Sequence, residues 1–363
     1  MKNNFFLLAL LAISISCSSQ KQEKNPEYPY KDYITETKKM PFSNNDFYYQ
    51  FTKQVFTINT NCYLSILNLK KNQLTIFEIP TFELVYQKDN IDFGGIVAAI
   101  DIHNFDTIYV IINKTLVQTD TSYKVVNKWT IDPISQEYGN DYYIGKPLHV
   151  DEPYFYVGHY PNHALVTKQR RTTYFSKHHI IKLSFCKSDT ILNYYGKFPD
   201  VYLKHNYDLD LCRFTIKDSF IITSFKETDS IYINNKAIAS VRSNYFTKNK
   251  EKDISKINDT EYNNKRATEN CRYGPLLYNP YTKHYYRMFH FATNYRNKDG
   301  TINSPDNAKK SIIVTDTNFH VLKEIVLPPE YFIYDSYITP KGLMIKRENK
   351  NDKKNIYFDF FNL

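Results

Sequence analysis

Four polar side chains stand at equivalent places near the ends of two strand-like segments. Asp101 and His103 end one apolar stretch, and His149 and Asp151 end the next. Carboxylates and imidazoles are groups that transfer protons or fix a polar ligand. If the two segments lie side by side, the four groups could converge on one ligand. If they only meet water at a strand end, which is the commoner arrangement, they have no such role.

Arg287 is the fifth candidate, because it directly follows Tyr285 and Tyr286 on a strand-like segment. A guanidinium group there could hold a carboxylate or sulfate with two parallel hydrogen bonds. It could equally stack on neighbouring tyrosine rings as part of the structure. The sequence leaves both interpretations open.

Sequence motifs for catalysis or cofactor binding are missing. The chain has no G-x-S-x-G nucleophile motif and no H-E-x-x-H zinc motif, and its nine glycines form neither a phosphate-binding loop nor a dinucleotide fingerprint. Asp208 and Asp210 form a D-x-D pair, but the glycine and final glutamate of a calcium loop are absent. We therefore expect no catalytic residue, no metal and no cofactor.

The N-terminus has the features of an export signal. Lys2 precedes an apolar run over residues 5–13, which is too short to cross a bilayer. The following residues 14–17, Ser-Ile-Ser-Cys, resemble a bacterial lipobox, with Ser14 where leucine is usual. We expect residues 1–16 to be a lipoprotein signal peptide and Cys17 to carry the lipid that binds the membrane. An ordinary secretory signal and a single anchoring helix are the alternatives.

The predicted location outside the cytoplasm limits the possible partners. Residues 17–45 would form the lipidated cysteine and its tether, anchored to the outer membrane on its periplasmic or cell-surface face. The net charge of +9 would suit nucleic acid in a cytosolic protein, but export argues against that partner. An even number of cysteines in the mature chain permits two disulfides, although thiols are as compatible with a chain of this size. These cysteines are Cys62, Cys186, Cys212 and Cys271.

A repeat along the chain indicates the elements that must position these groups. A short alternating segment, a polar turn and an apolar run recur six times, and a second hairpin follows most copies. The anchors of the apolar runs lie 46 to 65 residues apart, which are the sizes of propeller blades with insertions. These anchors are Tyr63, Tyr109, Phe155, Phe220, Tyr285 and Leu343. The sequence predicts an all-β, six-bladed propeller over residues 46–363.

The sixth copy lacks one outer strand, because the chain stops after a single strand-like segment at residues 355–361. A closed propeller takes the missing strand from its N-terminus, and residues 46–51 are the expected donor. Two insertions interrupt the repeat: residues 161–179, which form the most basic stretch of the chain, and residues 243–270, a solvated loop or a lid with about one helical turn. A β-sandwich or two small barrels would also give short, regularly spaced strands.

Several segments of the second half carry a family resemblance. They are residues 273–280 running into Tyr285, Tyr286 and Arg287, residues 312–316, residues 321–324 and residues 341–343. With the lipobox and the six repeats, they resemble an uncharacterised family of Bacteroidetes lipoproteins, the domain of unknown function 4221 family, of the TolB-like six-bladed propeller type. Asn279 stands where aspartate is expected. The resemblance implies the propeller fold and supplies no catalytic residue.

Two functions from different classes fit these features. The first is a membrane-anchored propeller that binds or scaffolds an envelope protein or a glycan or peptide ligand. The second is a propeller enzyme, a hydrolase or lyase, acting on a glycan or peptide of the cell envelope; a purely structural envelope protein is a third. Carboxylates or histidines within hydrogen-bond reach of each other at the channel mouth would favour the enzyme.

Overall fold

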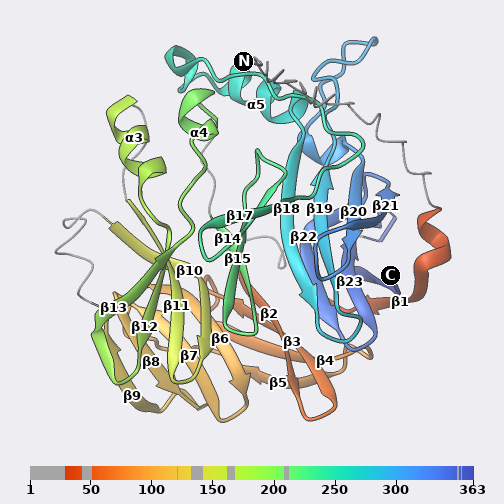
Figure 1. Cartoon of the computed structure of the whole chain (residues 1–363). Helices are drawn as coiled ribbons and strands as arrows, with labels where there is room; N and C mark the ends of the chain where they lie inside the picture. The colour runs from red at the N-terminus through yellow and green to blue at the C-terminus, as the bar shows by residue number, and fades with distance from the viewer. Residues whose placement is uncertain are drawn as a thin grey trace, which may run out of the picture.

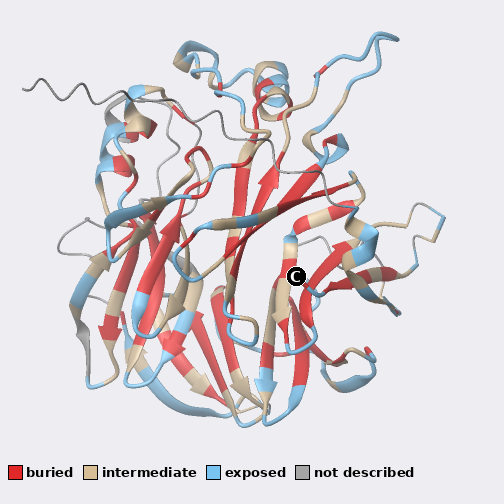
Figure 2. Ribbon diagram, turned by 45° about the vertical axis from the view of Figure 1, so that its right-hand side comes forward, coloured by how far each residue is buried: buried red, intermediate tan, exposed pale blue. Residues whose placement is uncertain are grey.

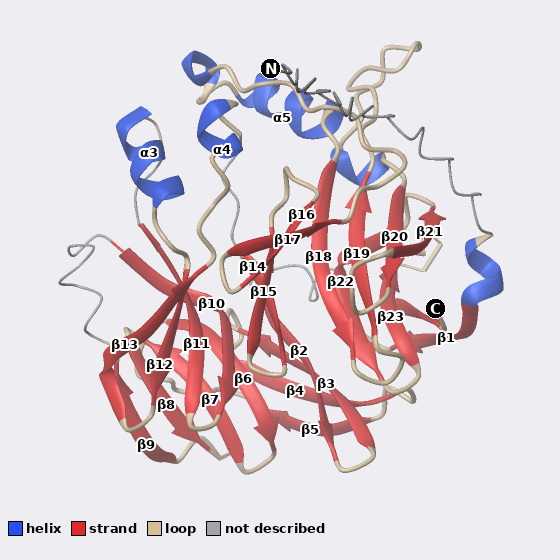
Figure 3. Ribbon diagram, in the orientation of Figure 1, coloured by secondary structure: helices blue, strands red, loops and turns tan. Residues whose placement is uncertain are grey.

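The computed structural model describes residues 29–42, 51–120, 122–131, 142–161, 168–207, 212–349, 351–352 and 354–363. In this part of the chain, six four-stranded antiparallel sheets form a ring around a central axis (Figures 1 and 3). The protein is therefore a six-bladed β-propeller, as its repeats predict. The signal peptide, Cys17 and most of the proposed tether lie outside the described residues.

Blades 1 to 3 each run from an innermost to an outermost strand in chain order. Blade 1 is β2 (Phe51–Ile58), β3 (Asn61–Asn68), β4 (Gln73–Ile79) and β5 (Leu84–Lys88). Blade 2 is β6 (Val97–Asn104), β7 (Thr107–Ile112), β8 (Thr115–Thr119) and β9 (Val125–Thr130). Blade 3 is β10 (Tyr142–Asp151), β11 (Tyr154–Pro161), β12 (Ile180–Ser184) and β13 (Lys187–Tyr195).

Blades 4 and 5 follow the same order, and blade 6 is completed from the N-terminus. Blade 4 is β14 (Arg213–Lys217), β15 (Phe220–Ser224), β16 (Ser230–Ile233) and β17 (Lys236–Ser240). Blade 5 is β18 (Arg272–Asn279), β19 (His284–His290), β20 (Lys310–Thr315) and β21 (Val321–Leu327). Blade 6 is β22 (Tyr331–Thr339), β23 (Gly342–Arg347), β24 (Ile356–Phe361) and β1 (Ile34–Met40).

The apolar runs of the repeat become the second strand of each blade. All six anchors, from Tyr63 on β3 to Leu343 on β23, lie on these strands. A second strand is covered on both faces by neighbouring blades, so it contains consecutive apolar residues instead of an alternating pattern. Outermost strands such as β5 and β9 are mostly exposed. Figure 2 shows buried residues concentrated along the inner strands and exposed residues at turns and helices.

The core is divided among the blade interfaces. Each of six hydrophobic clusters combines side chains from two adjacent blades, and together they pass around the whole ring. The cluster between blades 1 and 6, for example, joins Leu64 and Phe77 to Phe358 and Phe360. A single four-stranded sheet could not bury both of its faces, so the blades stabilise one another only as a closed ring.

The ring closes through an N-terminal strand, but the predicted donor was wrong. The strand β1 pairs with β24, from Ile34 opposite Phe361 to Met40 opposite Ile356. Of the expected donor, Phe51 begins β2, the innermost strand of blade 1, and residues 46–50 lie outside the described residues. The polar segment 34–40 suits an outermost strand with one solvated face. The closing strand thus lies within the stretch predicted to be tether.

The three described α-helices lie together at one end of the ring (Figure 1). They are α3 (Lys168–Ser176), α4 (Val201–Lys204) and α5 (Thr260–Glu269). There are also 3₁₀ helices at Tyr30–Tyr33, Ile254–Lys256 and Pro305–Asn307, and the first of them lies at the side of the ring, next to β1. The second insertion therefore contains an α-helix of ten residues, more than the single turn expected. The Asp259 side chain caps this helix by accepting the backbone N–H of Tyr262. Among the described residues, no helix is long and apolar enough to span a bilayer, and no disulfide joins the cysteines.

Candidate functional site

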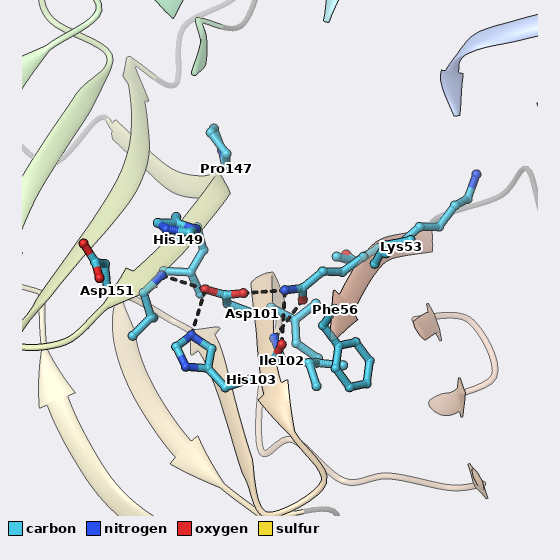
Figure 4. A pocket seen from close by; sticks show the side chains of 14 residues that line it. Lys53, Phe56, Asp101, Ile102, His103, Pro147, His149 and Asp151 are labelled. Carbon is cyan, nitrogen blue, oxygen red and sulfur yellow. Dashed lines mark hydrogen bonds and ion pairs between the residues drawn. The ribbon is translucent and has the colours of Figure 1, made fainter. Parts of the chain in front are cut away.

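A polar cavity of about 690 Å³ lies beside the axis, against the innermost strands of blades 1, 2 and 3 (Figure 4). Its wall consists of residues 52–56 of β2, 100–103 of β6 and 147–151 of β10. Three first strands therefore contribute equivalent stretches to one pocket. Asp101, His103, His149 and Asp151, the four residues predicted from their spacing, all line it.

Asp101 joins the three blades at the base of this pocket. Its side chain is buried, with 4% of its surface exposed. Gln54 Nε2 on β2 donates to one carboxylate oxygen at 2.6 Å, and the backbone N–H of Val150 on β10 donates to the other at 2.6 Å. The Asp101 carboxylate therefore connects β2 and β10 to its own strand, β6, and holds the register between the three blades.

Gln54 completes the junction between blades 1 and 2. Its amide oxygen accepts the backbone N–H of Ile102 at 2.7 Å, and its amide nitrogen also donates to the Ile102 carbonyl at 3.2 Å. An amide side chain that pairs with both backbone groups of a neighbouring strand replaces a β-ladder contact there. The pocket wall is therefore built from positioned groups.

His103 is the titratable group most closely coupled to Asp101. Its Nε2 lies 3.5 Å from Asp101 Oδ2, and about a third of its side chain is exposed. Hydrogen bonding to Asp101 raises the pKa of His103 above its usual value, although burial opposes that shift. The charged imidazolium is thereby favoured at the pocket surface.

His149 and Asp151 are more accessible than this pair. Both are exposed side chains of β10, and Asp151 lies apart from Asp101 in Figure 4. The concave wall surrounds His149 with protein, which lowers its pKa, although water still reaches the ring through the open pocket. The two histidines thus differ: His103 favours its cationic form and His149 its neutral form.

A second charged group extends the wall toward blade 6. Lys53 on β2 donates to Asp335 on β22 at 2.6 Å, and both side chains are largely buried. Sequence reasoning missed Lys53 and Gln54, because it began the first repeat at residue 55 and so left them outside the first strand. The signal that could have found them is that the first strands of the next two repeats carry polar residues.

Arg287 lies in blade 5, outside this pocket, and is fully buried. Its guanidinium group donates to the carbonyl oxygens of residues 225, 228, 229 and 241 in blade 4. The same group lies 3.9 Å from the centre of the Tyr273 ring. These contacts match the structural alternative for Arg287, because its donors are directed at the neighbouring blade.

The pocket offers hydrogen-bond donors and acceptors of both charges to a small polar molecule. No group of three or more potential metal ligands occurs in the part of the chain that the structure describes. Asp208 and Asp210 lie outside it. Cys17, the predicted lipid site, also lies outside it. Ligand binding and lipidation therefore stay predictions.

Fold and pocket together define the class: a six-bladed β-propeller with a polar pocket beside its axis. The family model named domain of unknown function 4221 matches residues 94–326, and the chain belongs to that family. The match confirms the resemblance found in the second half of the sequence. None of the curated proteins matches the chain.

Two solved structures have the same fold. The crystal structure of a member of this family from Bacteroides vulgatus is 16% identical, with a TM-score of 0.67, over 91% of this chain and 97% of that one. A putative exported protein from Bacteroides fragilis is 10% identical, with a TM-score of 0.54, over 94% of this chain and 98% of that one. At such identities, the likeness concerns the fold alone.

Proposed function

We propose that this protein is a lipid-anchored, extracytoplasmic binding propeller whose axial pocket holds a small polar ligand, a saccharide or a peptide fragment. The observation that carries the proposal is the Asp101 junction. It fixes the first strands of three blades and leaves His103, His149 and Asp151 on the wall of one open cavity. Rigidly positioned polar groups around a concave space are the usual features of a ligand site.

The balance of charge supports a neutral or zwitterionic ligand. Asp101 is paired with His103, and Lys53 is paired with Asp335. The charged groups at the base of the pocket face partners of opposite sign, and Asp151 is an exposed carboxylate on its wall, so a simple anion is disfavoured there. Hydroxyl, amide or paired amine and carboxylate groups suit such a wall better.

The spacing of the exposed groups supports binding over catalysis. Among the described residues, no hydrogen bond or ion pair joins His149 or Asp151 to the pair of Asp101 and His103. General acid and base groups act on one substrate from within hydrogen-bond reach of the atoms they protonate. Scattered polar groups can instead contact different parts of one ligand.

The proposed location in the cell envelope rests on the N-terminal sequence. A lipobox-like segment ending at Cys17 and a short apolar run precede the propeller. The description of the Bacteroides fragilis neighbour agrees with export. A lipid on Cys17 would hold the ring at the outer membrane, on the periplasmic or the cell-surface face, and leave its pocket open to the envelope.

The binding proposal predicts a pocket-dependent ligand response. Neutral oligosaccharides and short peptides should include at least one ligand with a saturable calorimetric titration. The double variant His103→Ala, His149→Leu should weaken its binding by roughly tenfold or more, because two pocket hydrogen bonds are lost. The matched control is His320→Gln, an exposed histidine outside the pocket, and it should bind like wild type. Equal affinity in all three proteins would show that the ligand does not bind in the axial pocket.

The anchoring proposal predicts that Cys17→Ser moves the protein from the membrane fraction to the soluble fraction. The change removes the only thiol at the expected lipid site, and the mass of the mature protein should fall by that of the acyl groups. Cys186→Ser, at an exposed cysteine of the propeller, is the control and should stay with the membrane. Unchanged mass and fractionation of Cys17→Ser would contradict the tether.

One contact favours the enzyme as a second candidate. His103 beside a buried carboxylate, with a raised pKa, is suited to general acid catalysis on a glycan or peptide. Under this alternative, a substrate from the same panel is converted to product. His103→Gln then abolishes turnover while binding is retained, whereas a pure binding protein gives no product with any variant.

A further inference from the structure

A second cavity, of about 470 Å³, lies between blades 2 and 3, away from the axial pocket. It shares no lining residue with that pocket. We call it the Trp129 groove. Its lining residues are Tyr109, Gln118, Asn127, Trp129, Glu152, Pro153 and Phe185.

Strand register explains why these side chains gather. Tyr109 on β7 is paired with Gln118 on β8, and Gln118 is paired with Asn127 on β9. Directly opposed residues of neighbouring strands point to the same face of a sheet. Trp129 lies two residues beyond Asn127 on the same strand, so it shares that face. These side chains of blade 2 face blade 3, which contributes Phe185 from the β12–β13 turn and Glu152 from the β10–β11 turn.

The groove has an aromatic wall that is only partly covered. The rings of Trp129 and Phe185 lie 4.7 Å apart in an edge-to-face contact, and Tyr109 lies 5.6 Å from Phe185. Tyr109 is buried, whereas Trp129 and Phe185 are half-buried. The outer rings therefore extend the core between the blades into an accessible apolar surface.

The rim of the groove is polar and ordered. Asn127 Nδ2 donates to Gln118 Oε1 at 2.7 Å, which orients both amides. The Tyr109 hydroxyl donates to Glu152, so that carboxylate is also held in place while its side chain remains exposed. An oriented amide pair and a carboxylate together present both donors and acceptors at the edge of the aromatic wall.

We infer that the Trp129 groove binds a pyranose ring of a neutral glycan. A sugar ring has one apolar face of C–H groups that packs on an aromatic ring, and hydroxyl groups at its edge that need paired donors and acceptors. The groove supplies both parts side by side. Among the described residues that line it, Glu152 is the only charged one, so repulsion disfavours an acidic sugar. This site is independent of the axial pocket.

The sequence provides a direct probe, because Trp129 is the only tryptophan of the chain. Its fluorescence, excited where tyrosine does not absorb, reports the groove alone. The experiment uses the full mature chain and titrates it with cellotriose, triacetylchitotriose and a trimer of galacturonic acid. We expect a saturable change in intensity or emission wavelength with at least one neutral trimer, and a weaker one or none with the acidic trimer.

Two variants make the test specific. Gln118→Ala with Asn127→Ala removes the rim hydrogen bonds but keeps Trp129, and it should weaken binding by roughly tenfold. The axial variant His149→Leu should titrate like wild type, which separates this inference from the proposed function. The thermal midpoint of each variant checks that it is folded. No response to either neutral trimer, a stronger response to the acidic trimer, or equal affinity in the rim variant would overturn the inference.

Discussion

The free energy of unfolding should decrease by about 4 kcal/mol per pH unit as the protein is acidified below pH 6. Three buried histidines give this effect: His159, His179 and His290. Burial, their largest perturbation, lowers the pKa of His159 and of His290 to about 3 and that of His179 to about 4. All three therefore stay neutral in the folded ring at pH values where a histidine of the unfolded chain is charged.

The sign follows from proton binding. Between pH 6.5, the ordinary histidine pKa, and the lowered pKa values of the folded protein, the unfolded chain binds more protons than the folded one. The free energy of unfolding therefore falls as the pH is lowered. Relative to neutral pH, each histidine lowers the free energy of unfolding by about 2 kcal/mol at pH 5, and the three together lower it by about 6 kcal/mol. That is comparable with the total stability of an ordinary domain.

Urea denaturation between pH 7.5 and pH 5 measures this dependence. His290→Gln and His179→Gln each should reduce the slope by about 1.4 kcal/mol per pH unit, one proton's share, whatever their effect at neutral pH. His320→Gln, at an exposed position, should keep the wild-type slope. A wild-type stability that is flat over this interval, or buried-site variants with the full slope, would show that these histidines are not held neutral.

Replacing Arg287 by methionine should lower the free energy of unfolding by about 3–5 kcal/mol. The guanidinium group satisfies four carbonyl oxygens of blade 4 from a strand of blade 5. Methionine keeps the apolar volume but removes the guanidinium donors, although the Asp229 carbonyl still accepts the backbone N–H of Val241. The pKa of Arg287 falls to about 10 because of burial, so it remains charged at neutral pH.

Two further variants distinguish the geometry from the charge. Arg287→Lys keeps a cation, but a single ammonium group cannot follow the fork of a guanidinium group to four acceptors, so most of the loss should remain. Arg213→Met, at an arginine that is only half-buried, should change stability by less than about 1 kcal/mol. Chemical denaturation at pH 7.5 measures all three. A loss below about 1 kcal/mol in Arg287→Met would refute the role of Arg287 as a clamp between blades.

The number of blades could be predicted because each second strand is enclosed by its neighbours and is consecutively apolar. The closing strand could not be identified in the same way. Residues 34–40 are polar except for Ile34 and Met40, so they carry little strand signal, whereas residues 46–51 are rich in aromatic residues; neither pattern shows which strand is the partner. Only the pairing of Met40 with Ile356 reveals the order.

The axial pocket was partly predictable for a related reason. Asp101 and His149 both lie near the ends of the first strands of successive repeats, so the repeat itself places them on adjacent first strands. The Trp129 groove depends on the register across three strands and on a turn of the next blade, which no local pattern specifies. Arg287 illustrates the same limit, because its partners lie in another blade, up to 62 positions away in the sequence.

The central claim, that the axial pocket holds the ligand, is tested most directly by histidine-selective nuclear magnetic resonance during a titration with the ligand identified by calorimetry. The resonances of His103 and His149, assigned by substitution, should shift together and saturate at the calorimetric affinity, while those of the buried His290 stay in place. Saturable shifts confined to histidines outside the pocket, with His103 and His149 unmoved, would contradict it.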